Sequence, residues 1–283
     1  MFGGQDQKAE NGASALQAGG NITVSQTNNY GLSVADVREL VTTFVRDHLP
    51  MVRQVAQAEA QANAREFVEH LFAELAAQNK ADLLRELERP AAQAVFTEAT
   101  IGAAKRGAEM DLSLLAKIVV NRLEAPKESV LRFVSEEAAA LLPKLNGDHI
   151  AFLGFTLLLA NLQFTAATDM TRLEALCAHT LPHIRGGMNM AFGHREYLSG
   201  LGLISINMMA TGDAFNAFMV QKYPFFNMQE VQNGQFPVLA ELYTSYKSTL
   251  LPAIALTAPG KFIACLLLQR CVPCDPAVFI PDR

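Results

Sequence analysis

Cys271 and Cys274 form a C-x-x-C motif near the end of this chain, in the segment Cys271-Val272-Pro273-Cys274. This spacing supports either thiol–disulfide exchange or one half of a zinc site. A reactive thiol is favoured at the N-terminus of a helix, where the helix dipole lowers its pKa. We expect a helix over residues 259–271, which puts Cys271 at the opposite end. The motif therefore indicates no redox centre on its own.

A zinc site at this motif needs a second pair of ligands. The candidates for that pair are Cys177, His179 and His183. Structural zinc sites use four ligands at defined spacings, and neither half of this set is complete. Packed or incidental cysteines and histidines are therefore the stronger interpretation, and we expect no metal and no cofactor. The alternative zinc set consists of Cys177, His179, Cys271 and Cys274.

Two short polar segments, Asp148-His149 and His194-Arg195-Glu196, contain residue types that transfer protons in acid–base sites. Single polar residues at helix starts are more often caps or surface groups. The sequence has no serine elbow, no Walker loop and no H-E-x-x-H motif. Gly186-Gly187 lacks the strand–turn–helix context of a phosphate-binding loop. We therefore assign no catalytic residue, and an enzymatic function stays an alternative.

The segment 11–30 differs from the rest of the chain, because it has no charged side chain and is rich in Gly, Asn, Gln, Ser and Thr. At its centre Ile22 and Val24 alternate with polar residues, as in a β-strand. A segment without charge or proline can pair with copies of itself. A disordered tail is the alternative. The residues that we expect to drive assembly are Gln17, Gly20, Asn21, Ile22, Val24 and Gln26.

The rest of the chain has the pattern of helices. Residues 1–32 form a tail or assembly segment, and residues 33–79 form a long amphipathic helix, or a helix pair divided at Pro50. Shorter helices punctuated by Pro and Gly fill residues 80–283, with a shift from charged to aromatic and Met-rich helices near residue 147. The expected fold is all-α, a multi-helix bundle or an irregular helical array. The shorter helices are expected near residues 81–88, 91–105, 112–123, 127–142, 149–164, 171–183, 195–209, 214–222, 237–250 and 259–271.

The middle of the long helix, residues 54–65, consists mostly of alanine, glutamine and other strong helix formers. Such a stretch buries little by itself. It is typical of a spacer arm, or of a helix that packs closely against a copy of itself. The apolar face that follows is expected to contain Phe67, Val68, Leu71, Phe72 and Leu75.

Composition and charge limit the partners and the compartment. The 283 residues carry a formal net charge of -5, and the pI is near 5.7. Binding to a phosphate backbone needs a dense Lys/Arg surface, so we do not expect nucleic acid as a partner. The start has no basic region followed by an apolar run, which argues against a signal peptide. Four cysteines are too few for a disulfide framework, and we expect a cytoplasmic protein.

The longest apolar run covers residues 150–164 and is interrupted near its end by Asn161 and Gln163. It is shorter than the roughly 20 apolar residues that span a bilayer. A helix buried on all sides in a globular core is the favoured interpretation. In the alternative, this run and the segment 200–206 become exposed on oligomerisation and perturb a membrane.

Two stretches resemble known families. Leu16–Val24 resembles the Q-x-G-x-x-N type amyloid-signalling motifs of bacterial and fungal immunity proteins, which are similar in turn to the RIP homotypic interaction motif. Ala18 stands where those motifs usually have a β-branched residue. The order of elements, ending in Leu256–Ala264, is similar to uncharacterised bacterial helical proteins associated with anti-phage defence. There an L-T-x-x-G element opens the last helix.

This resemblance implies a cytoplasmic, self-associating helical protein of a bacterial conflict system, with no catalytic residues to transfer. We therefore predict a non-enzymatic, self-assembling interaction protein in defence or signalling. Its main partner is a copy of itself, and another defence protein is a further candidate. The alternatives are a membrane-perturbing effector and an enzyme or zinc-binding protein that uses the C-terminal cysteines.

Overall fold

The computed structural model describes residues 34–77, 83, 86–87, 89–207, 209 and 213–281, with side chains from residue 54 onward. The chain divides into two compact units, Met1–Arg53 and Gln54–Arg283. The expected assembly segment 1–32 lies outside the described residues, and most of the helix expected near 81–88 does too. In the first unit, residues 34–53 are helical. The second unit contains the other elements.

The expected long helix is present as a single element, α1 (Val34–Ala77), and Pro50 does not divide it. Within the second unit Phe67, Leu71 and Leu75 are buried, at the four-residue spacing that keeps them on one helix face. Phe72 was expected on that face, but 52% of it is exposed. Successive helical residues differ by about 100° around the axis, which turns Phe72 away from Leu71.

Three helices form the first layer of the body: α2 (Pro90–Arg106), α3 (Leu112–Glu124) and α4 (Val130–Leu141). The side chains of Asp111 and Ser129 accept backbone N–H groups in the first turns of α3 and α4 and so define where these helices begin. The three helices pack against one another. Arg122 of α3 is buried and donates Nε to a carboxylate oxygen of Glu136 on α4 at 2.9 Å.

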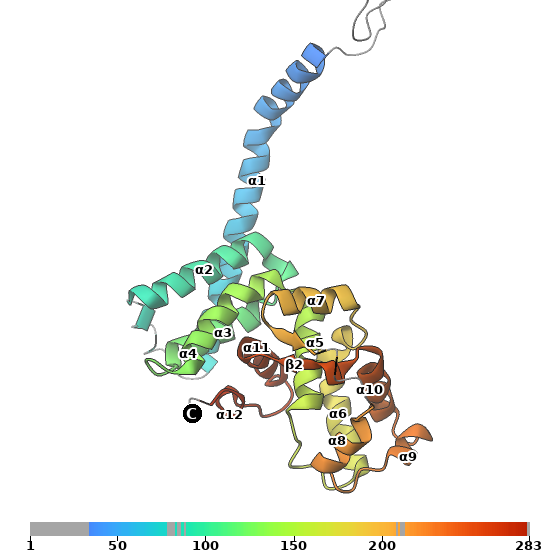
Figure 1. Ribbon diagram of the computed structural model, residues 1–283. Coiled ribbons are helices and arrows are strands. Elements are labelled where there is room, and N and C mark those ends of the chain that lie inside the picture. The colour runs from blue at the N-terminus through green and yellow to red at the C-terminus, as the bar shows by residue number, and fades with distance from the viewer. Residues whose placement is uncertain are drawn as a thin grey trace, which may run out of the picture. The chain divides into compact units, whose positions relative to one another are not determined.

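Residues 150–160 of the apolar run lie in α5 (Gly147–Ala160), in which every residue from His149 to Leu159 is buried. The expectation of a core helix is thereby confirmed, but the helix expected over 149–164 is wrong beyond Ala160. α11 (Ala258–Leu268) packs along α5 and also contacts α3 and α4. Figure 1 shows α5 and α11 between the α2–α4 layer and the helices near α6 and α10. Among the described helices, none combines the length and hydropathy needed to cross a membrane.

The second half of the body contains a small sheet that the sequence analysis missed. α6 (Met170–Ile184) and α7 (Phe192–Gly200) are followed by β1 (Ile204–Ile206), which pairs antiparallel with β2 (Ile254–Leu256). The helix expected over 195–209 is therefore wrong beyond Gly200. A glycine at positive φ, Gly202, turns the chain, and alternation in β1 buries Ile204 while Ser205 is exposed.

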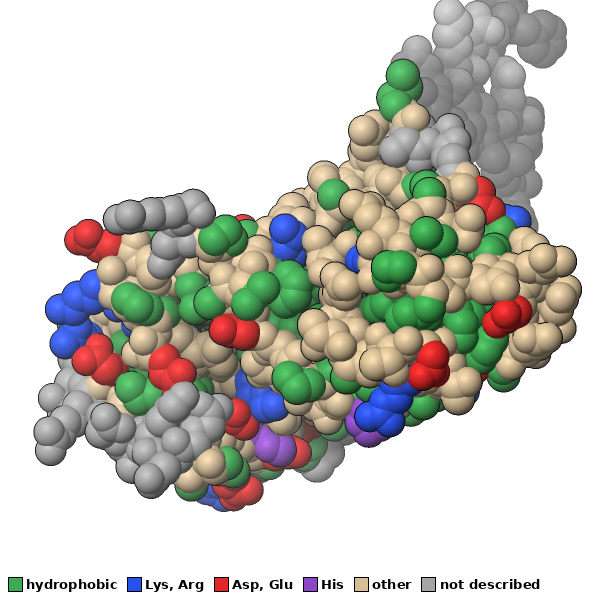
Figure 2. Space-filling view, turned by 90° about the horizontal axis from the view of Figure 1, so that it is seen from below, with side chains coloured by type: hydrophobic (Ala, Val, Ile, Leu, Met, Phe, Trp, Pro, Cys, Tyr) green, Lys and Arg blue, Asp and Glu red, His purple; other side chains and the backbone are tan. Residues whose placement is uncertain are grey.

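The remaining elements complete an irregular helical array. They are α8 (Phe215–Lys222), α9 (Met228–Gln232), α10 (Pro237–Ser248), α12 (Pro276–Phe279), and the 3-10 helices η2 (Gly107–Glu109), η3 (Leu142–Lys144), η4 (Arg185–Gly187) and η5 (Leu251–Ala253). The all-α fold class is confirmed, with β1 and β2 as a minor addition. On the face seen in Figure 2, acidic, basic and hydrophobic side chains are interspersed.

The L-T-x-x-G element joins the small sheet to α11. Thr257 is the N-cap of α11, and its hydroxyl donates to the carbonyl of Gly202 at 2.6 Å. A Cβ on Gly260 would lie 2.1 Å from the carbonyl oxygen of Leu203, so only glycine fits there. The element thus fixes the start of α11, although α11 is not the last helix, because α12 follows it.

Candidate functional site

The four residues of the alternative zinc set do not meet in a ligand cluster. Cys177 is buried on α6, and burial followed by the charge of Glu174 raises the pKa of its thiol to about 12. His179, two residues further along the same helix, is exposed. Throughout the described part of the chain, no group of three or more His, Cys, Asp or Glu side chains could hold a metal ion.

The C-x-x-C motif follows the C-terminal end of α11, as expected. The thiol of Cys271 donates to the carbonyl of Leu268 at 3.3 Å, and burial together with Cys274 raises the pKa of Cys271. Both cysteines border an open cavity of about 630 Å³. Cys265, which the sequence analysis did not single out, is fully buried within α11, and the neighbouring Cys274, followed by burial, raises the pKa of its thiol.

The two polar segments that resembled fragments of an acid–base site do come together. Nε2 of His149, on α5, lies 3.0 Å from Nδ1 of His194, on α7. Tyr197 of α7 places its ring 5.4 Å from that of His149, and its hydroxyl donates to the carbonyl of Lys144 at 3.0 Å. His149 and His194 are called the α5–α7 histidine pair.

The capping of α5 assigns the protons in this pair. Asn146 accepts the backbone N–H of His149 at 2.9 Å, and its own N–H donates to Nδ1 of His149 at 3.2 Å. This is a capping box with histidine in place of the usual Glu or Gln. Because Nδ1 accepts, the neutral ring carries its proton on Nε2 and donates it to His194. His149 Nε2 then has no lone pair for a metal ion or for proton abstraction.

The surroundings favour the neutral form of His149. Burial, followed by the neighbouring His194, lowers the pKa of His149, and the charge of Asp148 opposes this only in part. A protonated His149 ring could not accept from Asn146 and donate to His194 at once, because both of its nitrogens would carry protons. The contact between His149 and His194 therefore attaches α7 to the start of α5.

The neighbouring Arg195 anchors the same helix from its other side. It is buried, its Nη1 donates to the carbonyl of Thr249, and its guanidinium lies 5.2 Å from the ring of Phe192. Burial lowers the pKa of Arg195. Glu196 is exposed and does not join the histidines in a site. The segment 194–196 thus fixes the position of α7.

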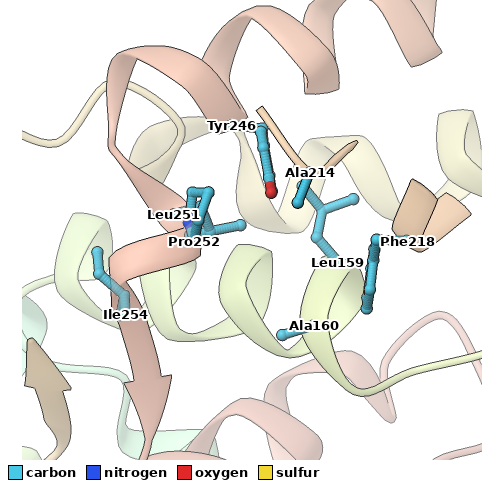
Figure 3. A pocket seen from close by; sticks show the side chains of 8 residues that line it. All are labelled: Leu159, Ala160, Ala214, Phe218, Tyr246, Leu251, Pro252 and Ile254. Carbon is cyan, nitrogen blue, oxygen red and sulfur yellow. The ribbon is translucent and has the colours of Figure 1, made fainter. Parts of the chain in front are cut away.

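An apolar cavity of about 250 Å³ lies at the C-terminal end of α5, where side chains from α5, α8, α10, η5 and β2 converge (Figure 3). Beside this cavity, Lys222 connects α8 to the end of α5. Its Nζ donates hydrogen bonds to the carbonyls of Leu159 and Leu162 at 2.8 and 2.7 Å. Its ammonium lies 4.3 Å from the ring of Phe218, and burial lowers its pKa to about 8. The lining consists of Leu159, Ala160, Ala214, Phe218, Tyr246, Leu251, Pro252 and Ile254.

This cavity is shaped for a small apolar group and offers no catalytic side chain. The sequence analysis could not predict this cavity, because its lining residues come from five separate elements of the chain. Its only ionisable lining side chain, Tyr246, has its pKa raised by burial and then by the charge of Asp213. The cavity therefore adds no motif that supports an enzyme.

Comparison with known proteins gives one match. A family model described only as ":-like" matches residues 31–233, which is more than half of the chain. The chain belongs to that family. The match runs from just before α1 to the end of α9, so it includes the long helix and ends before α10, α11 and the C-x-x-C motif. No curated protein and no solved structure matches the chain.

Proposed function

We propose that the protein is a non-enzymatic, self-assembling interaction protein whose copies are joined through α1. The supporting observation is a line of exposed small and apolar residues, the α1 stripe, defined as Val55, Ala58 and Ala62. Val55, the largest of them, is 63% exposed. The buried residues of the same helix segment, Phe67, Leu71 and Leu75, lie on a different face.

The spacing of the α1 stripe fits helix pairing. Val55, Ala58 and Ala62 are three and four residues apart, the spacing of the a and d positions in a coiled coil. Alanines at such positions let two helix backbones approach closely. Helices in water take most of their stability from the packing of an apolar face. A second copy that offers the same stripe supplies that packing.

We propose that the N-terminal segment forms a second contact between copies of the chain. If residues 20–26 pair with copies of themselves, as their resemblance to amyloid-signalling motifs implies, strand pairing would strengthen contacts made by α1. From the same resemblance we propose that assembly serves a bacterial defence or signalling system in the cytoplasm, with another defence protein as a further partner.

Two features of the described residues support this proposal over a membrane-perturbing effector and over an enzyme or zinc protein. A membrane-perturbing effector would have to expose α5, whose residues from His149 to Leu159 are all buried in the centre of the body. An enzyme or zinc protein would have to use Cys177 and His179 with the C-terminal cysteines, which form no metal cluster among the described residues. α1, by contrast, needs no rearrangement to meet a partner.

The test is the mass of purified full-length protein by light scattering. The variant Val55→Glu/Ala58→Glu introduces two charges into the α1 stripe and should lower the mass towards the 30.8 kDa of one chain. The control Ala56→Glu/Gln57→Glu adds the same two charges at exposed positions, each about 100° around the helix from the nearest stripe residue, and should keep the wild-type mass. Equal masses for both variants would contradict assembly through α1.

The contribution of the N-terminal segment is measured separately. Deletion of residues 1–30, or the substitution Ile22→Pro, should lower the mass if strand pairing joins copies, because proline removes a ladder hydrogen bond. An unchanged mass for both would remove the segment from the proposal and leave α1 as the assembly element.

A further inference from the structure

The apolar cavity at the C-terminal end of α5 has a buried side and a side whose residues keep exposed surface. Its buried side, called the cavity floor, consists of Leu159, Tyr246, Leu251 and Ile254. Its more exposed side, called the cavity mouth, consists of Ala160, Ala214, Phe218 and Pro252. A small molecule can therefore enter past the mouth while the floor stays packed in the body.

The lining of this cavity carries no charge. None of its eight side chains is ionised at neutral pH, because the pKa of Tyr246 is raised. The ammonium of Lys222 lies over the ring of Phe218 and is already bound to the carbonyls of Leu159 and Leu162. A charged ligand would lose its hydration in the cavity without gaining a partner, which is unfavourable. The lining therefore selects an uncharged ligand.

The wall that η5 contributes is held by the protein itself. Leu250 has a φ of 51°, in the left-handed region that leucine rarely adopts, and such a conformation persists only where the surrounding structure holds it. This turn leads directly into Leu251 and Pro252, which line the cavity. On its other side, the carbonyl of Thr249 accepts a hydrogen bond from the buried Arg195. Because the wall is in place without a ligand, binding need not order it.

We propose that this cavity is a binding site for an uncharged aromatic molecule of one or two fused rings. Its volume of about 250 Å³ is larger than the apolar cavity of about 150 Å³ that holds benzene in another protein, which leaves room for a second ring. The proposal goes beyond self-assembly and does not depend on it, because none of the lining residues lies in α1.

Two aromatic lining residues favour a ring over an aliphatic chain. Phe218 lies at the mouth and Tyr246 on the floor, and aromatic rings attract one another in offset and edge-to-face geometries. Figure 3 shows the hydroxyl of Tyr246 directed towards the space between the other lining side chains. A hydroxyl or carbonyl group on the ligand can form a hydrogen bond there. The preferred ligand is therefore an aromatic molecule with one such group.

Fluorescence titration of the full-length protein with 2-naphthol tests the proposal. The chain contains no tryptophan, so protein emission does not obscure the naphthol signal. We expect saturable binding with a dissociation constant on the order of 10–100 µM, the range for a ligand of about ten non-hydrogen atoms. The matched probe 2-naphthoate has the same two rings and a negative charge, and it should bind at least about tenfold more weakly. No saturable binding of 2-naphthol, or equal affinity for the two probes, overturns the proposal.

Two substitutions at the cavity mouth locate the bound ring. Ala160→Phe and Ala214→Phe each add an aromatic side chain at the mouth, one from α5 and one from the start of α8. Each should weaken 2-naphthol binding at least about tenfold, because the added ring takes the space of the ligand. The control Asn216→Phe adds the same side chain at an exposed position of α8, about 200° around the helix from Phe218, and should keep the wild-type affinity. Wild-type affinity in either mouth variant, or an equal loss in the control, would overturn the proposal.

Thermal melting gives a second readout and shows whether each variant folds. 2-Naphthol should raise the melting temperature of wild type and of Asn216→Phe, because a ligand that binds the folded state stabilises it. It should leave the melting temperatures of Ala160→Phe and Ala214→Phe unchanged. If one mouth variant shows no cooperative transition, the other mouth variant and the comparison of the two probes in wild type decide. An equal shift in wild type and in a folded mouth variant contradicts the proposal.

Discussion

The body around α5 and the exposed part of α1 use their side chains in opposite ways. In the body, side chains of reactive types form hydrogen bonds within the protein. His149 caps α5 and pairs with His194, and Lys222 donates to two carbonyls at the other end of α5. On α1, Val55 and Phe72 are largely exposed. Residues with reactive side chains therefore serve as structural anchors in the body, whereas the α1 stripe consists of valine and alanine.

The largest effect on the body is expected from Gly260→Ala. Its Cβ would lie 2.1 Å from the carbonyl oxygen of Leu203, so either α11 or the small sheet must shift. Overpacking against backbone costs about 3 kcal/mol or more. Urea unfolding should show this loss. The control Gly193→Ala adds a methyl group on α7 where no atom lies within 4 Å, and its stability should be unchanged or slightly higher.

The next effect is expected from Glu136→Gln, which removes the charge facing the buried Arg122. Breaking a buried ion pair costs about 3–5 kcal/mol, and we expect about 2–3 kcal/mol here because solvent reaches part of Glu136. The control is Glu241→Gln, which breaks the exposed pair with Arg185 and should cost less than about 1 kcal/mol. Equal losses in urea unfolding would show that the burial of Arg122 has no energetic consequence.

Lys222→Met tests the anchor at the other end of α5. The variant keeps most of the apolar stem but loses both hydrogen bonds to Leu159 and Leu162. Part of that loss is offset, because a buried ammonium no longer has to be desolvated, and we expect about 2 kcal/mol of destabilisation. Lys127→Met, at an exposed position, should be close to neutral. A melting temperature for Lys222→Met equal to wild type would remove Lys222 as an anchor.

The smallest effect is the pH response of the α5–α7 histidine pair. The pKa of His149 is lowered in the folded protein, so the unfolded chain binds its proton more tightly. The contribution of neutral His149 is complete above its unfolded pKa of about 6.5 and is lost as the pH falls below that value towards the folded pKa. We expect at most about 1 kcal/mol, the scale of one cap.

His149→Gln is the matched variant for this pH response, because Gln can complete the capping box and does not titrate. Unfolding free energies at about pH 7.5 and 5.5 should differ less in the variant than in wild type. The same difference in both proteins would mean that other groups cause the pH response.

Much of the fold was predictable because helices repeat every 3.6 residues and end at Pro or Gly. α3, α6 and α11 lie close to their expected ranges for that reason. β1 and β2 could not be found, since three-residue strands have no measurable period and pair across 50 residues of chain. α9 and α12 were also not predicted, because helices of five and four residues are too short to show a repeat of apolar residues.

The candidate sites were predictable only as fragments. The sequence identified His149 and His194 as polar groups at helix starts, but their contact joins residues 45 positions apart. Long-range packing makes this pair, and no local pattern in the sequence encodes it. The C-x-x-C spacing drew attention to Cys271, but its thiol donates to the carbonyl of Leu268 and belongs to no metal cluster among the described residues.

The central claim is that the exposed α1 stripe joins copies of the chain, and the mass of unmodified full-length protein in solution tests it most directly. Light scattering over a range of concentrations should give a mass well above the 30.8 kDa of one chain. This mass should stay constant or increase as the protein concentration increases. A mass of 30.8 kDa at every concentration would contradict it.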